Sequence, residues 1–194
     1  MPAPTLYLDL GSPFAYLALE RANEVLGAEP ELHPVLLGAI FKQRGYGSWA
    51  HTAGREQRVR EIESRASRYG LPPLHWPPGW PPEGLVAMRC AVWASRAGAL
   101  AAFSRAVFAA EFATGADIAD PGVLTAAAER AGLDGEQMLS CSGRQDVKDE
   151  LRALTVEAWE AGVRGVPSLR VGEAMFFGDD QLELAAAHLR GPGL

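Results

Sequence analysis

The chain has 194 residues, of which 48% are hydrophobic and 22% are charged, and this composition excludes an intrinsically disordered chain. It fits one globular domain, or one domain that carries an insertion. The formal net charge is −6 and no basic run is present, which argues against a nucleic-acid or anionic-membrane partner.

Targeting signals and cysteines give expectations about the compartment. No apolar stretch reaches the roughly 20 residues of a membrane span. Asp9 interrupts the short apolar run near the N-terminus and no basic segment precedes it, so no secretory signal is predicted. Cys90 and Cys141 lie far apart, outside any CxxC or metal-binding spacing. We expect a cytoplasmic protein without a disulfide scaffold or a metal site.

The N-terminal region predicts a β–α–β unit. Residues 1–10 predict a strand in which leucines alternate with other residues. Residues 14–26 predict a helix, with Ser12 as its N-cap and Pro13 at its first position. Residues 32–37 predict a second strand. A β–α–β unit favours parallel pairing with a right-handed crossover.

The middle of the chain, residues 38–154, predicts helices and loops without a convincing strand. Residues 71–82 are rich in proline, which is incompatible with helix and central strand alike. Trp76 and Trp80 lie in this stretch, and they either cover an apolar substrate pocket or act as hydrophobic plugs. Helices are expected over residues 55–69, 84–97, 99–113, 121–131 and 146–161.

The C-terminal region returns to strands. Residues 168–171 and 174–177 predict a hairpin, and residues 181–189 predict a last helix. The order β–α–β, helical insert, β–β–α is that of an α/β thioredoxin-like fold. The expected domains are a discontinuous thioredoxin-like domain, residues 1–37 and 155–194, and an inserted all-helical domain, residues 38–154.

Ser12 is the first candidate functional residue. A helix N-terminus has unpaired N–H groups and a partial positive charge, which stabilise an anion such as a thiolate. A serine cannot supply the thiolate itself, but its hydroxyl can donate a hydrogen bond to a thiolate of a ligand. The alternative is that Ser12 only caps the helix.

Two further candidates lie near the C-terminus. Pro167 precedes a predicted strand, and a cis bond there would direct the N–H and C=O of Val166 toward an extended, peptide-like ligand. The alternative is a plain strand entry. Asp179 and Asp180 start the last helix, where they either compensate its dipole or bind an ammonium group of a ligand.

Taken together, these segments resemble the 2-hydroxychromene-2-carboxylate isomerases and the related kappa-class glutathione transferases, of the DsbA-like thioredoxin superfamily. The similarity is carried by Gly-Ser-Pro-Phe-Ala-Tyr-Leu-Ala at residues 11–18, by residues 36–42, and by residues 161–168 and 176–182. It extends over nearly the whole chain. The fold that it implies is the one that the order of elements predicts.

The resemblance implies a glutathione site. Ser12 would hold the glutathione sulfur as a thiolate. Val166 would pair its backbone with the cysteinyl part, beside a cis Pro167. Asp179 and Asp180 would hold the γ-glutamyl end.

The resemblance also implies a reaction on a small aromatic molecule. In the isomerases, the thiolate is thought to add reversibly to a polarised carbon–carbon double bond, which then rotates. Phe14, Lys42, Tyr46 and Trp80 are the candidate substrate-binding residues. Lys42 either pairs with a ligand carboxylate or is a solvated surface residue, and Phe14 either flanks the site or packs in the core. Family members are often homodimers.

Two other classes remain as alternatives. A disulfide oxidoreductase is disfavoured because Ser12 stands where a thiol is needed. A thioredoxin-fold binding protein without glutathione chemistry is favoured by two departures from the family pattern: Tyr46 stands in place of an asparagine and Gln181 in place of an arginine.

Overall fold

The computed structural model describes residues 3–191. Its elements, in chain order, are β1 (Thr5–Leu8), α1 (Pro13–Leu26), β2 (Glu31–Pro34), α2 (Leu37–Arg44), the 3-10 helix η1 (Trp49–His51), α3 (Arg55–Arg68), α4 (Leu85–Arg96), α5 (Leu100–Phe108), the π-helix η2 (Ala109–Ala113), α6 (Pro121–Arg130), α7 (Gly135–Ser142), α8 (Gln145–Glu160), β3 (Ser168–Val171), β4 (Ala174–Phe177), the 3-10 helix η3 (Asp179–Gln181) and α9 (Leu182–Arg190).

The sheet has four strands in the order β2-β1-β3-β4. β1 pairs with β2 in parallel and with β3 antiparallel, and β3 pairs with β4 antiparallel. Leu6 in β1 lies between Leu32 of β2 and Leu169 of β3. The predicted thioredoxin-like topology is confirmed.

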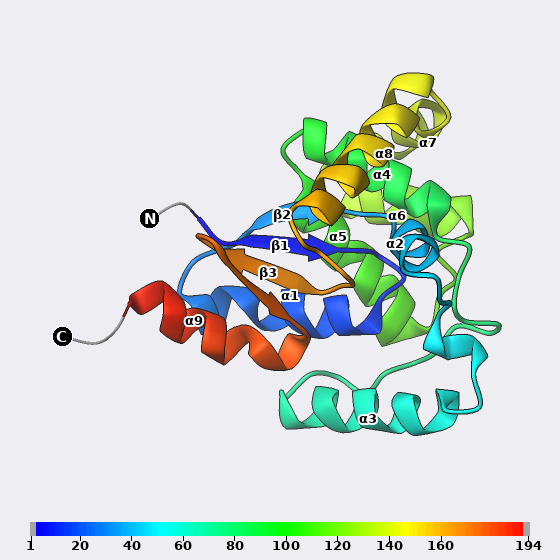
Figure 1. Cartoon of the computed structure of the whole chain (residues 1–194). Helices are drawn as coiled ribbons and strands as arrows, with labels where there is room; N and C mark the ends of the chain where they lie inside the picture. The colour runs from blue at the N-terminus through cyan, green and yellow to red at the C-terminus, as the bar shows by residue number, and fades with distance from the viewer. Residues whose placement is uncertain (1–2, 192–194) are drawn as a thin grey trace.

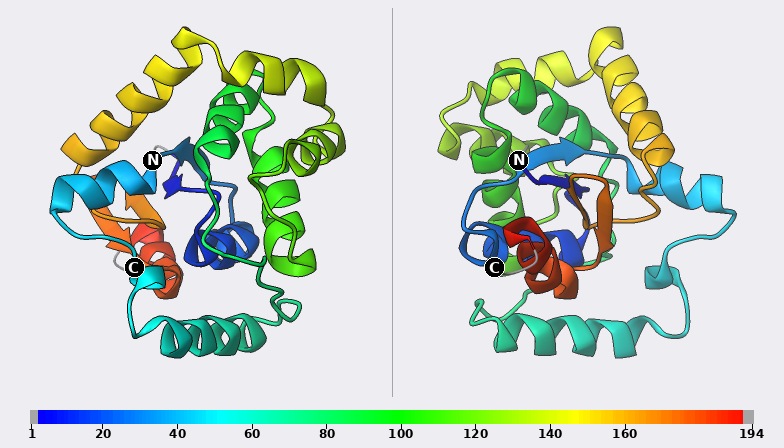
Figure 2. Two further views of the ribbon diagram at one scale, coloured as in Figure 1. Left: turned by 90° about the vertical axis from the view of Figure 1, so that its right-hand side faces the viewer. Right: turned by 60° about the vertical axis from the view of Figure 1, so that its left-hand side comes forward.

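Helices cover both faces of this sheet. In Figure 1, α1 and α9 lie side by side below the strands, and α8 lies above them. α3 lies apart from the other inserted helices and contacts α1. Figure 2 shows α3 joined to the rest of the chain by two long connections. This placement brings α3 to the same edge of the molecule as the start of α1.

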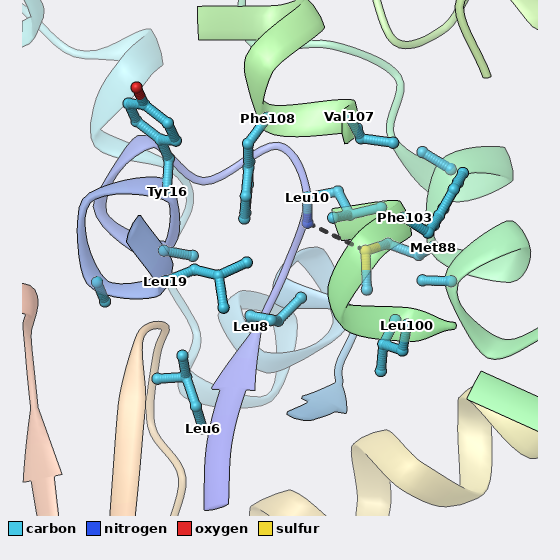
Figure 3. Packing of buried hydrophobic residues seen from close by; sticks show 14 of the residues in the cluster. Leu6, Leu8, Leu10, Tyr16, Leu19, Met88, Leu100, Phe103, Val107 and Phe108 are labelled. Carbon is cyan, nitrogen blue, oxygen red and sulfur yellow. Dashed lines mark hydrogen bonds between the residues drawn. The ribbon is translucent and has the colours of Figure 1, made fainter. Parts of the chain in front are cut away.

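One hydrophobic cluster runs from the sheet into the helical region (Figure 3). Leu8 is fully buried and packs in the same cluster as Phe103 and Phe108 of α5. Beyond the strand end, the N–H of Leu10 donates to Sδ of Met88 in α4, at 3.2 Å. Burial of such side chains is the main contribution to folding. The predicted boundary between residues 154 and 155 falls inside the continuous helix α8, and the two-domain division stays a prediction.

Most predicted elements are confirmed to within a few residues, but the first two strands are shorter than predicted. β1 covers only Thr5–Leu8 of the predicted residues 1–10, of which residues 1–2 lie outside the described part of the chain. β2 ends at Pro34, and α2 begins at Leu37. The N–H of Leu37 donates to Oδ2 of Asp9, at 2.8 Å, and the N–H of Leu36 donates to the Thr155 hydroxyl, at 3.0 Å. These side chains satisfy the backbone that a longer strand would have paired.

Within residues 3–191, the α-helices α2 and α7, the 3-10 helix η1 and one helical irregularity were not predicted. α2 and α7 are only eight residues long, and so short a stretch gives a weak periodic signal. The predicted helix over residues 99–113 exists, but its last turn is a π-helix. Within residues 3–191, no helix is long and apolar enough to cross a membrane.

Candidate active site

Ser12 lies at the N-terminus of α1 and is almost completely buried. Its hydroxyl oxygen accepts from the N–H of Ala15, at 3.3 Å, so the capping role is confirmed. Pro13 follows at the first helical position, where the missing N–H costs no hydrogen bond. Because the oxygen accepts the capping bond, the hydroxyl proton remains for donation to a ligand.

The turn before β3 contains the Val166–Pro167 bond, which is cis as the resemblance implies. Within residues 3–191, neither the N–H nor the C=O of Val166 has a hydrogen-bond partner. A Cβ on Gly165 would lie 2.7 Å from the Phe177 ring, which is 59% exposed, so a larger residue here would have to displace that ring. The turn therefore presents an unpaired stretch of backbone beside an exposed aromatic ring.

A cleft of about 620 Å³, called the larger cleft below, gathers most of the predicted site residues. Ser12 lies in its wall together with the turn before β3 and the start of η3. The predicted residues that line it are Ser12, Phe14, Tyr46, Val166, Pro167, Asp179 and Asp180. Four arginines that the sequence did not single out also line it: Arg44, Arg58, Arg65 and Arg164.

Asp179 forms a closed network at one end of the larger cleft. Its Oδ1 accepts from Arg65, at 2.9 Å, and its Oδ2 accepts from the Tyr69 hydroxyl, at 2.9 Å. Burial raises the pKa of Asp179, and the Arg65 guanidinium opposes that rise. The side chain of Asp180 is 49% exposed and lies 3.2 Å from Arg65. Asp180 is thus the carboxylate that is more accessible to a ligand.

The arginines divide into two groups. Arg58 and Arg65, both on α3, each pair with Glu61. Across the larger cleft, Arg44 donates to the carbonyl of Arg164, at 2.6 Å. From its sequence alone, a helix as rich in charge as α3 is expected to face solvent on all sides. The structure shows that α3 packs near α1, and this packing places its arginines at a cleft.

A second cavity of about 300 Å³, called the smaller pocket below, adjoins the first. Trp49 and Trp80 contribute to its wall, with ring centroids 5.3 Å apart. Trp80 also packs edge-on against Trp76, at 4.8 Å. The residues that line both cavities are Ser12, Leu37, Phe41 and Trp49. Ser12 therefore lies where a charged cleft meets an aromatic pocket.

Asp9, which lines the smaller pocket, holds the strand end in place. Its Oδ1 accepts from the N–H of Gly11, at 2.9 Å, and its Oδ2 from that of Leu37. Burial raises the pKa of Asp9, and the two backbone hydrogen bonds oppose that rise. The sequence showed Asp9 only as a break in an apolar run, because its partner Leu37 is distant in the chain.

Lys42 lies outside the set of residues that line the two cavities. It is exposed on α2, whereas its neighbour Phe41 lines both cavities. Successive helical residues point about 100° apart, so the two side chains cannot share a direction. Tyr46 does line the larger cleft, 47% exposed, with its ring 5.8 Å from that of Phe41.

Comparison with known proteins identifies the family and agrees with the fold. A family profile described as DSBA-like thioredoxin domain matches residues 5–190. Human glutathione S-transferase kappa 1 is 29% identical over 96% of this chain and 89% of its own length. The 2-hydroxychromene-2-carboxylate isomerase of Sphingobium xenophagum is 26% identical over 94% of this chain and 95% of its own. A solved structure of a 2-hydroxychromene-2-carboxylate isomerase has a TM-score of 0.81 at 21% identity, covering 96% of this chain and 94% of that one.

Proposed function

The chain belongs to the DSBA-like thioredoxin-domain family, and from that premise we propose that it is a glutathione-dependent isomerase of the 2-hydroxychromene-2-carboxylate isomerase type. Its substrate is an aromatic electrophile. Ser12 is the catalytic residue, the larger cleft binds glutathione, and the smaller pocket binds the aromatic substrate. The curated relatives, an isomerase and a glutathione transferase, are both enzymes that act on small molecules.

The observation that carries this proposal is the position of Ser12 at the junction of the two cavities. A ligand sulfur beside this hydroxyl would lie at the N-terminus of α1, where the helix dipole favours a thiolate. The same point borders the aromatic wall of Trp49 and Trp80. A thiol in the larger cleft and an aromatic molecule in the smaller pocket would therefore meet at Ser12.

The larger cleft has the polar groups that a zwitterionic tripeptide needs. The Asp180 carboxylate suits an ammonium group, and the unpaired backbone of Val166 suits the peptide part. Arg44 and Arg164, at another part of the cleft, suit a carboxylate. When bound, glutathione supplies a soft nucleophile that adds reversibly to a polarised double bond.

The remaining residues orient the substrate and exclude water. Trp49, Trp80 and Phe41 give an aromatic ring flat surfaces to stack on. Asp9 fixes the backbone of Gly11, directly before Ser12, and so holds the hydroxyl in its place. A donor fixed in advance stabilises the developing negative charge without reorganisation.

A transferase of the kappa type is the second candidate. The identity to human glutathione S-transferase kappa 1, at 29%, favours it as much as the isomerase. The two functions share the activated thiolate and differ in whether the thiol leaves the product. Turnover of an aromatic acceptor, with glutathione either released or consumed, therefore distinguishes the two functions. Binding of glutathione alone does not.

Titration with reduced glutathione tests the shared step, with binding measured by calorimetry and the bound thiolate by its ultraviolet absorbance. Wild type is compared with Ser12→Ala and with Asp120→Ala, a matched control that removes the cap of α6 far from the cleft. Each variant loses a helix cap, which costs about 0.5–2 kcal/mol of stability. Only Ser12→Ala should reduce the thiolate absorbance of bound glutathione, by at least about tenfold in thiolate population.

Two outcomes contradict the proposal. The first is no binding by the wild type at millimolar glutathione, which indicates a binding protein for another ligand. The second is equal thiolate absorbance in wild type and Ser12→Ala. If binding and the effect of Ser12→Ala are both observed, turnover of hydroxybenzylidenepyruvates without loss of free glutathione identifies the isomerase. Consumption of the thiol identifies the transferase.

A further inference from the structure

Glu111 is a fully buried carboxyl group that the proposed reaction does not use. Its side chain is 0% exposed, and neither carboxyl oxygen has a hydrogen-bond partner within residues 3–191. Buried polar groups are nearly always paired, because leaving one unpaired costs its full desolvation energy. An unpaired buried carboxyl therefore requires an explanation.

The helix that carries Glu111 turns it inward. Glu111 continues the buried stripe of α5, three and four residues after Phe108 and Val107. It lies in η2, a five-residue π-helix. Such π-turns are rare and are frequently found at functional sites. A helix built for packing alone would have an apolar side chain at this position.

Trp80 is the second buried group without a partner. Its Nε1 has no acceptor within residues 3–191, although the residue is buried and lines the smaller pocket. Trp80 packs against Trp76 with ring centroids 4.8 Å apart, and Trp76 packs against Phe112, the residue after Glu111, at 5.9 Å. The Trp80 indole opposes the rise in the pKa of Glu111, although the two groups do not meet the geometry of a hydrogen bond. An indole N–H only donates and a carboxyl oxygen accepts, so the two unpaired groups are complementary.

The neighbouring tryptophan shows the completed form of this pair. Nε1 of Trp76 donates to Oε1 of Glu63, at 2.9 Å, on the exposed face of α3. Trp76 and Trp80 pack edge to face, and each of these adjacent indoles lies near one glutamate. The surface pair is closed, and the pair beside the smaller pocket is open.

We propose that Glu111 is a positioning residue that accepts the Trp80 indole N–H when an aromatic molecule fills the smaller pocket. A small rotation of the indole closes the pair, and the closed pair fixes Trp80 as the wall of the pocket beside Ser12. Given the proposed function, that wall orients the aromatic substrate toward the thiolate. Glu111 acts through Trp80 and is absent from the lining of either cavity.

Other charged groups around this pair do not compete for the indole. The negative charges of Asp9 and Asp117 also raise the pKa of Glu111 and so disfavour its ionised form. Arg55 donates to the backbone carbonyl of Trp80, at 3.3 Å, and leaves Nε1 unpaired. Burial, the largest influence, raises the pKa of Glu111 well above its ordinary value. A neutral carboxyl still accepts through its carbonyl oxygen.

The indole N–H signal of Trp80 in ¹H–¹⁵N spectra of the full chain tests the proposal, with Trp80→Phe giving its assignment. The probe is 2-naphthol, a neutral aromatic molecule. We expect the probe to move this signal downfield in the wild type and in Glu111→Gln, which keeps an acceptor. In Glu111→Leu the shift should disappear and the affinity for 2-naphthol should fall about fivefold. The matched control Glu63→Leu should move the Trp76 signal instead.

The proposal is overturned if Glu111→Leu leaves both the Trp80 signal and the affinity for 2-naphthol unchanged. If Glu111→Leu does not fold, the test uses Glu111→Gln with 2-naphthol bound. Exchanging the carboxyl for an amide must then change the position of the Trp80 indole signal, relative to the wild type, more than that of Trp93. An equal effect on both signals refutes the pairing. None of these readouts requires glutathione. If the protein does not bind glutathione but the Trp80 signal responds to 2-naphthol as expected, the proposed function is wrong and the Trp80–Glu111 pair still stands.

Discussion

Two buried carboxyl groups, Asp179 at the larger cleft and Glu111 behind the smaller pocket, differ in what surrounds them. Asp179 has a guanidinium on one oxygen and a phenol on the other. The carboxyl oxygens of Glu111 have no hydrogen-bond partner within residues 3–191. Burial raises the pKa of both groups, but only Asp179 has a cation that opposes the rise.

The difference separates two ways to build a binding site. The network around Asp179 is complete before any ligand arrives, so it provides a rigid charged end to the larger cleft. The Trp80–Glu111 pair is incomplete, so part of the wall of the smaller pocket can still adjust. A site that holds one constant ligand and accepts varied partners benefits from this combination. The following changes test the contrast, from the largest expected effect to the smallest.

Arg65→Met should break the completed network. It leaves the Asp179 carboxyl buried without its cation, which we expect to lower the free energy of unfolding by about 3 kcal/mol. Urea denaturation at pH 7 measures this. The control Arg58→Met removes an exposed partner of Glu61 and should cost less than about 1 kcal/mol. Equal losses in the two variants would show that Asp179 does not depend on Arg65.

Glu111→Gln should change how stability depends on pH. Because burial raises the pKa of Glu111 above its ordinary 4.5, the unfolded chain loses this proton first as the pH rises. The wild type should therefore lose stability relative to the variant as pH rises from about 4.5, by up to about 1.4 kcal/mol per unit. The difference levels off above the folded-state pKa. Denaturation at several pH values measures it, and a constant difference would contradict an uncompensated carboxyl.

Tyr69→Phe removes one bond of the network and keeps the ring. The hydroxyl no longer donates to Asp179, and we expect a loss of about 1 kcal/mol in the free energy of unfolding. The guanidinium of Arg21 lies 3.6 Å from the centroid of this ring, and the phenylalanine retains that contact. Thermal denaturation against the wild type is sufficient. An unchanged variant would mean that Arg65 alone satisfies Asp179.

Glu63→Gln should have the smallest effect. The amide oxygen still accepts from the Trp76 indole on an exposed surface, so the stability should change by less than about 0.5 kcal/mol. Urea denaturation at pH 7 measures this change. A change comparable to that of Glu111→Gln would remove the distinction between the surface pair and the buried pair.

The sequence predicted the segments where local rules act. Ser12 and Pro13 specify the start of α1 because a cap and an N1 proline depend on adjacent residues only. The hairpin β3–β4 was predicted from two short apolar stretches joined by a turn at Gly172. Both segments were predicted closely, and each positions part of the larger cleft. The bounds of β2 were wrong because Asp9, which is distant in sequence, starts α2 at Leu37.

The four arginines and Glu111 could not be assigned to a site from the sequence in this way. A guanidinium on a charged helix such as α3 looks the same whether it faces water or a cleft. Glu111 did leave a signal, since it falls on the apolar stripe of α5, but its neighbour Trp80 is 31 positions earlier in a proline-rich loop. Lys42, expected near a ligand, lies on the exposed side of α2 because Phe41 occupies the side toward the cavities.

The sequence by itself determined the order of the strands and of the longer helices, and the serine at the start of α1. Local backbone chemistry decides these, through caps, proline geometry and strand alternation. The turn that presents Val166 was predicted through the family resemblance. Only the tertiary structure decided that Ser12 lies between a charged cleft and an aromatic pocket, that Asp179 is paired and that Glu111 is not. Those facts depend on contacts between residues far apart in the chain. Such residues come together only when the hydrophobic core packs.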